Sequence, residues 1–491
     1  MLFNSYEFVF IFFPVVFIGF FLIAKKNHSY AEIFLALASL CFYGWWSLQA
    51  LPLLLGSIVF NYLIGKKLRG GSVYVFYFGL IANLAVLGFF KYADFFVSNI
   101  NYMFDSMGIR RIAALNIILP IGISFYTFTQ IAFLVDCWKG KVKEQFFFRY
   151  LLFVTYFPHL IAGPIIHHAQ IMSQFANSQI YRVDYKKLSI AIIFVVIGMA
   201  KKILLADPLG ESSDILFGVA REGVAPSMIM SWLGVLAYTF QIYFDFSGYS
   251  DMAIGISLAL GIYLPINFNS PYQATNIIDF WRRWHISLSV FLRDYLYIPL
   301  GGNRFGNFRR YINLFITMLL GGLWHGANWT FVLWGAAHGL FLIINHRCES
   351  FFSGKLAFQS CWWIFFSRVI TFLAVASAWV LFRADNLSAA ITIYEGMLGF
   401  GGKTEGAFFH GFLADARRLS PDGPIWLVGT IFIAALIAFF APNLNGLLHS
   451  ARNSSIVQKL THWGFAPVFA GIFFLCILRF AKNSPFLYFQ F

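Results

Sequence analysis

One histidine lies in an apolar, glycine-rich stretch where an imidazole could act as a base. Residues 319–340 read LLGGLWHGANWTFVLWGAAHGL, with His325 among glycines and tryptophans. Ionisable residues inside apolar segments are costly and are therefore candidates for function. An imidazole with an ordinary pKa of about 6.5 also suits proton transfer near neutral pH. We expect His325 to be catalytic, with Trp324 and Asn328 as supporting residues.

A second histidine, His338, follows thirteen residues later in the same stretch. On one continuous helix this spacing separates it from His325 by roughly 20 Å along the axis. The two histidines therefore cannot form a metal-binding pair four residues apart. We expect one of them to be catalytic and the other structural, and we favour His325 for catalysis.

A third histidine, His285, lies in the segment 279–306, DFWRRWHISLSVFLRDYLYIPLGGNRFG. At about 100° per residue, one helical face is largely aromatic and apolar and includes Trp281, Trp284, His285, Leu288, Phe291, Leu292 and Tyr295. The other face carries Arg282, Arg283 and Arg293, a pattern typical of a helix in the membrane interface. These arginines either bind the phosphates of an anionic cytosolic donor or anchor lipid headgroups. His285 points into the protein, as a catalytic or a core residue.

A polar cluster interrupts the apolar pattern at residues 241–251, QIYFDFSGYSD. Its candidate supporting residues are Asp245, Ser247 and Tyr249. The sequence predicts a hinge between two apolar runs here. The cluster could orient a histidine or bind a coupling ion, and a serine here could instead cap the next helix.

Metal and phosphate-loop motifs are weak in this sequence. The histidines of residues 156–168, YFPHLIAGPIIHH, lie on a segment broken by proline and glycine and match no standard zinc spacing. The five cysteines show no CxxC or CxxH spacing. The segment GGNRFG is too short for a phosphate-binding loop. We predict that the protein binds no metal.

The composition is that of a protein embedded in a membrane. Of the 491 residues, 59% are hydrophobic and 11% are charged, against about 25% charged residues in soluble domains. This excludes an ordinary cytosolic enzyme, a disordered protein and a secreted disulfide-rich scaffold. The net charge of +14 comes from basic residues between apolar runs, which predicts membrane topology and contact with lipid headgroups rather than nucleic-acid binding.

The apolar runs predict an all-α polytopic membrane protein with roughly ten to twelve spans, formed by one membrane domain over residues 1–491. Candidate spans are residues 8–24, 30–46, 51–65, 72–90, 226–244, 248–264, 327–344, 362–382, 425–440 and 465–478. Residues 188–200, between two Lys-Lys pairs, look too short to cross. Residues 112–135 and 151–166 are interrupted by proline and glycine, which predicts re-entrant or interfacial helices around a site.

The distribution of basic loops predicts the orientation. Lysine and arginine follow the first and third apolar runs, whereas residues 47–50 after the second run are uncharged. By the positive-inside rule, the N-terminus lies outside the cytoplasm, and residues 282–310 lie on the cytoplasmic side.

The motifs WRRWHISLSVFLRDYLYIPLGGNR and GGLWHGANWTFVLWGAAHG, with histidines 40 residues apart, resemble the membrane-bound O-acyltransferase superfamily. Within it the chain is similar to the bacterial branch that acts in alginate O-acetylation. The segments MLFNSYEFVFIFFP, FPHLIAGPI, YFDFSGYSDMAIG and SPFLYFQF extend the resemblance nearly from end to end.

The resemblance implies a funnel-shaped helical protein with a thin centre pierced by a tunnel, in the bacterial inner membrane. It implies that His325 is catalytic and that His285 occupies the second signature position, which is Asn or Asp in many eukaryotic relatives. It also implies that acetyl-CoA is the cytoplasmic donor, with no further cofactor. The acetyl group would pass to a separate periplasmic hydrolase-like acetyltransferase, which modifies a polysaccharide.

Alternatives remain open for the acceptor and the class of activity. The acceptor could be an alginate-type exopolysaccharide, peptidoglycan or another glycan, or the reaction could be D-alanyl transfer to teichoic acid. A transporter without acyl chemistry is the alternative of another class. The sequence has no GxSxG nucleophile motif and no sizeable soluble domain, which favours dependence on a partner.

Overall fold

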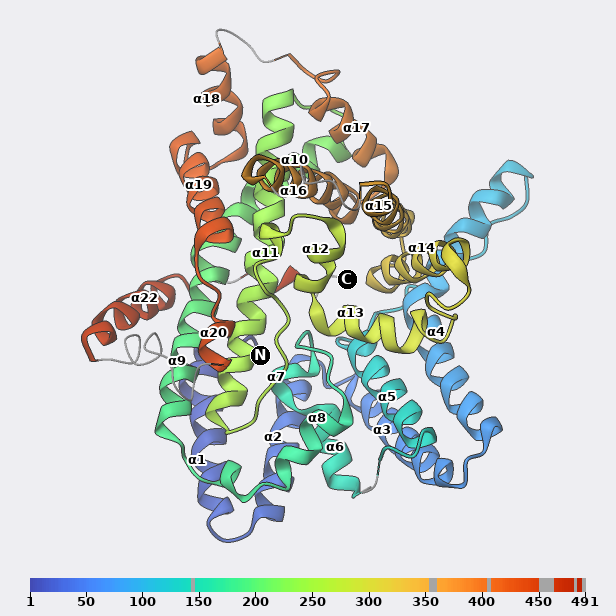
Figure 1. Cartoon of the computed structure of the whole chain (residues 1–491), viewed down its shortest axis with the longest axis vertical. Coiled ribbons are helices and arrows are strands. Elements are labelled where there is room, and N and C mark those ends of the chain that lie inside the picture. The colour runs from blue at the N-terminus through green and yellow to red at the C-terminus, as the bar shows by residue number, and fades with distance from the viewer. Residues whose placement is uncertain (143–145, 353–359, 404–407, 450–462, 481–483, 488–491) are drawn as a thin grey trace. The chain divides into compact units, whose positions relative to one another are not determined.

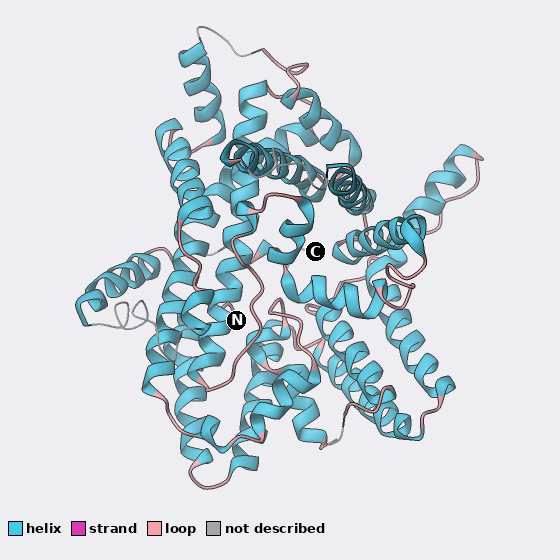
Figure 2. Ribbon diagram, in the orientation of Figure 1, coloured by secondary structure: helices cyan, strands magenta, loops and turns pink. Residues whose placement is uncertain are grey.

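The computed structural model describes the chain except for residues 143–145, 353–359, 404–407, 450–462, 481–483 and 488–491. The described residues form helices and loops, and none of them lies in a strand (Figure 2). This confirms the predicted all-α class. Helices satisfy their own backbone hydrogen bonds, as a bilayer interior requires.

The chain divides into two compact units, each assembled from separate stretches. The first comprises Met1–Ile197, Tyr249–Pro265 and Leu447–Gln490, and the second comprises Gly198–Gly248, Ile266–Gly446 and Phe491. Helices α9 (Tyr185–Ala200) and α11 (Met228–Ala259) each contribute residues to both units. The single domain expected over residues 1–491 stays a prediction.

The first unit holds the N-terminal helices and the last helix of the chain (Figure 1). Polar pairs tie these helices together, as Asn61 and Asn83 show by exchanging amide hydrogen bonds of 3.0 and 2.7 Å. Arg149 also forms a double hydrogen bond with the buried Glu32 carboxylate. The main helices are α1 (Phe13–Ala24), α2 (His28–Trp46), α3 (Leu51–Lys67), α4 (Val73–Ser106), α5 (Ile123–Trp138), α6 (Phe147–Thr155), α7 (Phe157–Leu160), α8 (His168–Phe175) and α22 (Ala466–Leu478).

The second unit contains both histidine motifs. A π-helical turn, η4 (Lys201–Ala206), leads into α10 (Asp207–Arg221). The helices that follow α11 are α12 (Ile277–Arg283), α13 (Ile286–Leu292), η6 (Arg293–Tyr297), α14 (Gly306–His325), α15 (Trp329–Phe352), α16 (Cys361–Arg383), α17 (Leu387–Met397), α18 (Phe408–Leu419) and α19 (Pro424–Phe440).

Three described helical stretches are long and apolar enough to cross a membrane by length and composition: Val73–Ser106, Tyr185–Arg221 and Cys361–Arg383. A fourth is added if His410–Leu419 and Pro424–Phe440, bent by 83°, are taken as one broken span. The total of ten to twelve spans stays a prediction. The expectation that residues 188–200 are too short was wrong, because the helix continues through Lys202 to Arg221 over 37 residues.

The predicted hinge at residues 241–251 was also wrong. The helix α11 runs unbroken from Met228 to Ala259, so Ser247 and Ser250 lie inside a helix and do not cap one. Close packing supports this continuous helix. A Cβ atom at Gly248 would lie 2.7 Å from the Gly198 carbonyl oxygen, so the glycine permits direct contact with the neighbouring helix.

Candidate active site

A tight antiparallel hairpin of α14 and α15 positions His325 (Figure 1). Glycines allow the two helices to touch backbone to backbone. A Cβ atom at Gly322 would collide with the Phe331 carbonyl oxygen, and one at Gly335 would collide with the Met318 carbonyl oxygen. The chain reverses between His325, the last residue of α14, and Trp329, the first of α15.

His325 is buried within aromatic side chains from three helices. His325 is 4% exposed to solvent. Its ring centroid lies 4.9 Å from that of Trp324, 5.2 Å from that of Trp334 and 5.1 Å from that of Phe382. The predicted supporting residue Trp324 therefore contacts the predicted catalytic histidine.

The reversal at 326–328 also brings His338 close to His325, which a continuous helix would have kept roughly 20 Å away. Both imidazoles lie edge to face with the Trp334 ring, at 5.2 Å for His325 and 4.8 Å for His338. His338 Nδ1 accepts a hydrogen bond of 3.3 Å from Trp281 Nε1. This contact places His338 in the aromatic core. Which of the two histidines is catalytic stays a prediction.

His285 lies at a break in the predicted interfacial helix. The structure ends α12 at Arg283 and begins α13 at Ile286, with His285 in the left-handed region at φ 42° and ψ 55°. The continuous helix assumed from the sequence was therefore wrong, although the predicted faces hold. His285 is fully buried, whereas Arg282 and Arg293 are exposed.

Aromatic rings and an amide lie against His285. Phe246 lies edge to face with the imidazole at 4.8 Å, and the Trp324 ring lies 6.5 Å away. The amide belongs to Asn267, whose Oδ1 lies 3.2 Å from His285 Nδ1. Burial lowers the pKa of His285 to about 3, so its imidazole is neutral at physiological pH.

Trp324 therefore connects the two signature histidines, since its indole ring neighbours both imidazoles. The motifs are 40 residues apart in the sequence, and the folding of α12, α13 and α14 within the second unit brings them together. Asn267 was missed by sequence reasoning. An asparagine in the polar loop after an apolar run has no distinguishing spacing, and its role depends on which side chain it faces.

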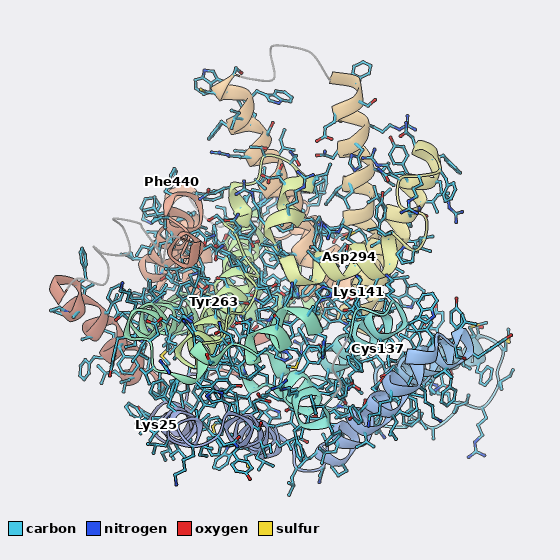
Figure 3. All side chains as sticks on the ribbon, turned by 60° about the horizontal axis from the view of Figure 1, so that its bottom comes forward. Lys25, Cys137, Lys141, Tyr263, Asp294 and Phe440 are labelled. Carbon is cyan, nitrogen blue, oxygen red and sulfur yellow. The ribbon has the colours of Figure 1, made fainter. Side chains whose placement is uncertain are left out.

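The three candidate donor-binding arginines differ in their partners. Arg283 pairs with Asp279 at 2.8 Å, and Arg293 pairs with Asp294 at 2.7 Å. Asp294, the partner of Arg293 on η6, is labelled in Figure 3. No ion pair is found for Arg282 among the described residues. Binding of phosphates by these arginines stays a prediction.

The remaining supporting residues fall into different surroundings. Asp245 forms a 2.6 Å ion pair with Lys202, and Asp207 pairs with the same ammonium at 2.8 Å. Lys202 belongs to the second of the two Lys-Lys pairs that flank residues 188–200. The Asn328 side chain caps the start of α15, because its Oδ1 accepts a hydrogen bond from the backbone N–H of Thr330. Its amide nitrogen donates to the Asp385 carbonyl oxygen. Tyr249 belongs to the first unit, where its ring stacks on Phe3. The roles predicted for Asp245, Ser247 and Tyr249 remain predictions.

The histidines of residues 156–168 have structural contacts in the first unit. His159 Nε2 lies 2.9 Å from the Phe153 carbonyl oxygen, and the His168 ring packs on Phe133 and Phe153. The described part of the chain contains no group of three or more His, Cys, Asp or Glu side chains that could hold a metal ion. That the protein needs no metal stays a prediction.

Comparison with known proteins places this geometry in a family. The model of the MBOAT, membrane-bound O-acyltransferase family matches residues 141–382, which include both His285 and His325. The peptidoglycan O-acetyltransferase of Helicobacter pylori is 44% identical over 438 residues, which cover 82% of this chain and 80% of that protein. The probable alginate O-acetylase AlgI of Pseudomonas aeruginosa is 42% identical, covering 90% and 81% respectively.

A more distant relative carries out a different acyl transfer according to its name. The teichoic acid D-alanyltransferase of Streptococcus thermophilus is 31% identical over 46% of this chain and 56% of its own length. The high identity over most of both chains to the first two relatives, together with the family match over both histidine motifs, shows that this multi-pass membrane protein belongs to the membrane-bound O-acyltransferase family and is an acyltransferase.

Proposed function

We propose that this acyltransferase takes acetyl groups from cytoplasmic acetyl-CoA and delivers them across the inner membrane for O-acetylation of an extracytoplasmic polysaccharide of the alginate type. A periplasmic hydrolase-like acetyltransferase is the proposed partner that completes the transfer. The single observation that carries the proposal is the placement of His285 and His325 beside one buried indole, in a chain 42% identical to a probable alginate O-acetylase.

The proposed chemistry needs a base and no bound metal. Acyl transfer breaks the C–S bond of the thioester and forms a C–O bond to a hydroxyl. In the proposal, His325 takes the hydroxyl proton during attack and returns it to the departing thiolate, so that free CoA leaves as a thiol. Burial of His325 within tryptophan and phenylalanine rings excludes competing water from the thioester.

The basic segment around α12 and η6 supports the cytoplasmic donor. Arg282, Arg283 and Arg293 carry the charges that would meet the phosphates of CoA, and the positive-inside rule places them on the cytoplasmic side. The same rule places the N-terminus in the periplasm. Lipid headgroups at these arginines would be the alternative occupant.

Peptidoglycan O-acetylation is a second candidate, favoured by the 44% identity to a peptidoglycan O-acetyltransferase. The two candidates share the donor and the histidines and differ in the acceptor. D-alanyl transfer ranks lower, because the relative with that name matches 46% of the chain.

The test is acetyl transfer from radiolabelled acetyl-CoA in proteoliposomes, with the periplasmic partner and either alginate or peptidoglycan as acceptor. Wild type should transfer label, and His325→Ala should abolish transfer while remaining folded in the membrane. His410→Ala, which alters an exposed histidine on α18, is the matched control and should keep activity. Full activity in His325→Ala would overturn the catalytic role, and absence of transfer by folded wild type with its partner would overturn the donor.

A further inference from the structure

The environment of Asn267 has features that the two histidine motifs do not explain. Asn267 is completely buried, in the loop between α11 and α12. Its Oδ1 accepts hydrogen bonds from the backbone N–H of Ser287 at 3.2 Å and from the Ser287 hydroxyl at 2.8 Å. The same oxygen lies 3.2 Å from His285 Nδ1. One amide oxygen thus contacts both the first turn of α13 and the imidazole.

These contacts determine which way the amide faces. A backbone N–H can donate and cannot accept, so the atom that faces Ser287 N must be the amide oxygen and not the amide nitrogen. Because that oxygen accepts, the nitrogen opposite it, His285 Nδ1, carries the proton. The neutral imidazole has one protonated nitrogen, and its lone pair is therefore on Nε2.

We propose that Asn267 is a positioning residue for acyl transfer, which holds His285 in its Nδ1–H form and keeps the Nε2 lone pair available to accept a proton. This inference rests on the proposed participation of His285 in the transfer. The same oxygen accepts from Ser287 N–H in the first turn of α13, and the Asn267 backbone carbonyl accepts from Ile286 N–H at 2.9 Å. Asn267 therefore contacts both the imidazole and the backbone that follows the left-handed turn at His285.

An amide suits this task better than a carboxylate would. A carboxylate against Nδ1 would favour the charged imidazolium and raise the pKa of His285, whereas a neutral amide fixes the tautomer without adding charge. Two ring neighbours of His285, Phe246 on α11 and Trp324 on α14, are uncharged. The acidic residues of α11 are Asp245, which is paired with Lys202, and Asp251. Helix α14 carries Arg309 and Arg310 near its start and ends at His325.

The discriminating variant is Asn267→Asp, assayed for acetyl transfer from acetyl-CoA across pH 5 to 9. The carboxylate keeps the acceptor for Ser287 and His285 but adds a charge. We expect the acidic limb of the kcat profile to move up by about one pH unit or more, with activity recovering at high pH. An unchanged profile, or a folded variant without activity at any pH, would overturn the inference.

A double-mutant cycle separates positioning from a structural role. Asn267→Ala should lower kcat about a hundredfold, as expected for a misplaced reacting group, with little change in KM. In a His285→Gln background the same substitution should have no further effect on kcat, because its action passes through the imidazole. Equal losses in both backgrounds would identify a purely structural residue and overturn the proposal.

Asn445→Ala is the matched control. Its buried amide donates to the Phe268 carbonyl at 2.6 Å, so it anchors the same loop one residue away without an observed contact to His285. The control should retain the wild-type pH profile. Failure of both Asn267 variants to fold, seen by gel filtration in detergent, would also overturn the positioning role. Absence of transfer by wild type would instead count against the proposed function.

Discussion

Lys202 Nζ lies 2.6 Å from Asp245 Oδ1, inside a helical stretch apolar enough to cross a membrane. A second carboxylate, Asp207, lies 2.8 Å from the same ammonium. The π-helical turn η4 begins at Lys201, and such turns often mark functional positions in helices. A charge inside an apolar helical stretch is costly unless it is paired. The pair joins α11 to the helix that runs from Tyr185 to Arg221.

We expect Lys202→Met to destabilise the protein by about 3–5 kcal/mol, because it removes the cation that pairs with the buried Asp245 carboxylate and with Asp207. The measurement is thermal unfolding in detergent. Lys186→Met, which removes an exposed lysine from α9, is the control and should change stability by less than about 0.5 kcal/mol. Equal behaviour of the two variants would show that the buried pair contributes no stability.

The close approach of α14 and α15 should not tolerate a methyl group. Gly322→Ala places a Cβ atom against the Phe331 carbonyl oxygen, so the hairpin must open at the cost of about 1–3 kcal/mol, and His325 must move with the end of α14. We expect a lower unfolding temperature and reduced acetyl transfer.

Gly429→Ala is the matched control for this substitution. Gly429 is also within a helix, α19, but a Cβ atom there would have no neighbour within 4 Å. We expect this variant to gain up to about 1 kcal/mol from helix propensity and to keep its activity. Comparable losses in both variants would contradict the assignment of Gly322 to the packing of the hairpin.

The buried histidines outside the spanning segments should make the protein sensitive to acid. Burial lowers the pKa of His285 to about 3 and that of His159 to about 4, below the ordinary value of about 6.5 in the unfolded chain. Between about pH 4 and pH 6.5, the unfolded state therefore binds more protons than the folded state. The free energy of unfolding is fully retained above about pH 6.5 and falls by up to about 1.4 kcal/mol per pH unit for each histidine as the pH decreases toward 4.

Thermal unfolding at several pH values checks this expectation. His285→Gln removes one titrating group and should make the dependence on pH shallower between pH 6.5 and 4. If the unfolding temperature of the wild type rose as the pH decreased from 6.5 to 4, the assignment of neutral buried imidazoles would be contradicted.

The arginines of the basic segment should contribute unequally to donor binding. Arg282 is exposed and has no ion pair among the described residues, whereas Arg283 and Arg293 are paired with neighbouring carboxylates. We expect Arg282→Gln to raise KM for acetyl-CoA about tenfold, the loss of one charged hydrogen bond of about 1.5 kcal/mol. Arg293→Gln should raise the KM for acetyl-CoA less, because the Arg293 guanidinium already pairs with the Asp294 carboxylate.

Steady-state kinetics in proteoliposomes at two salt concentrations provide the measurement. The effect of Arg282→Gln should shrink at high salt, because exposed charges are screened. Unchanged KM values for both variants would leave these arginines as lipid anchors.

Much of the site was predictable from residue types. A histidine in an apolar run is costly, and glycines such as those around His325 permit close backbone contact. The aromatic face that includes Trp281, Trp284 and His285 is buried as the helical period predicts. What the period could not show is the break at His285, because a left-handed residue in the middle of an amphipathic pattern leaves the spacing of the apolar residues almost unchanged.

Local composition misled in two other places. The polar residues 241–251 suggested a hinge, yet α11 continues through them because Asp245 is neutralised by Lys202 on another helix. Residues 188–200 lie between two Lys-Lys pairs, and these charges suggested a run too short to cross, yet the helix continues through Lys202. In both cases the sequence shows the charged residue, Asp245 or Lys202, but not the oppositely charged residue that pairs with it in the fold.

The sequence by itself determined that this is a helical membrane protein with buried histidines and a basic segment, because hydropathy and charge act locally along the chain. Tertiary structure decided which side chains meet. Trp324 neighbours His285 as well as His325, Trp334 contacts both His325 and His338, and Asn267 faces His285 Nδ1. Such contacts depend on where helices turn back and how closely they pack, which are properties of the folded chain.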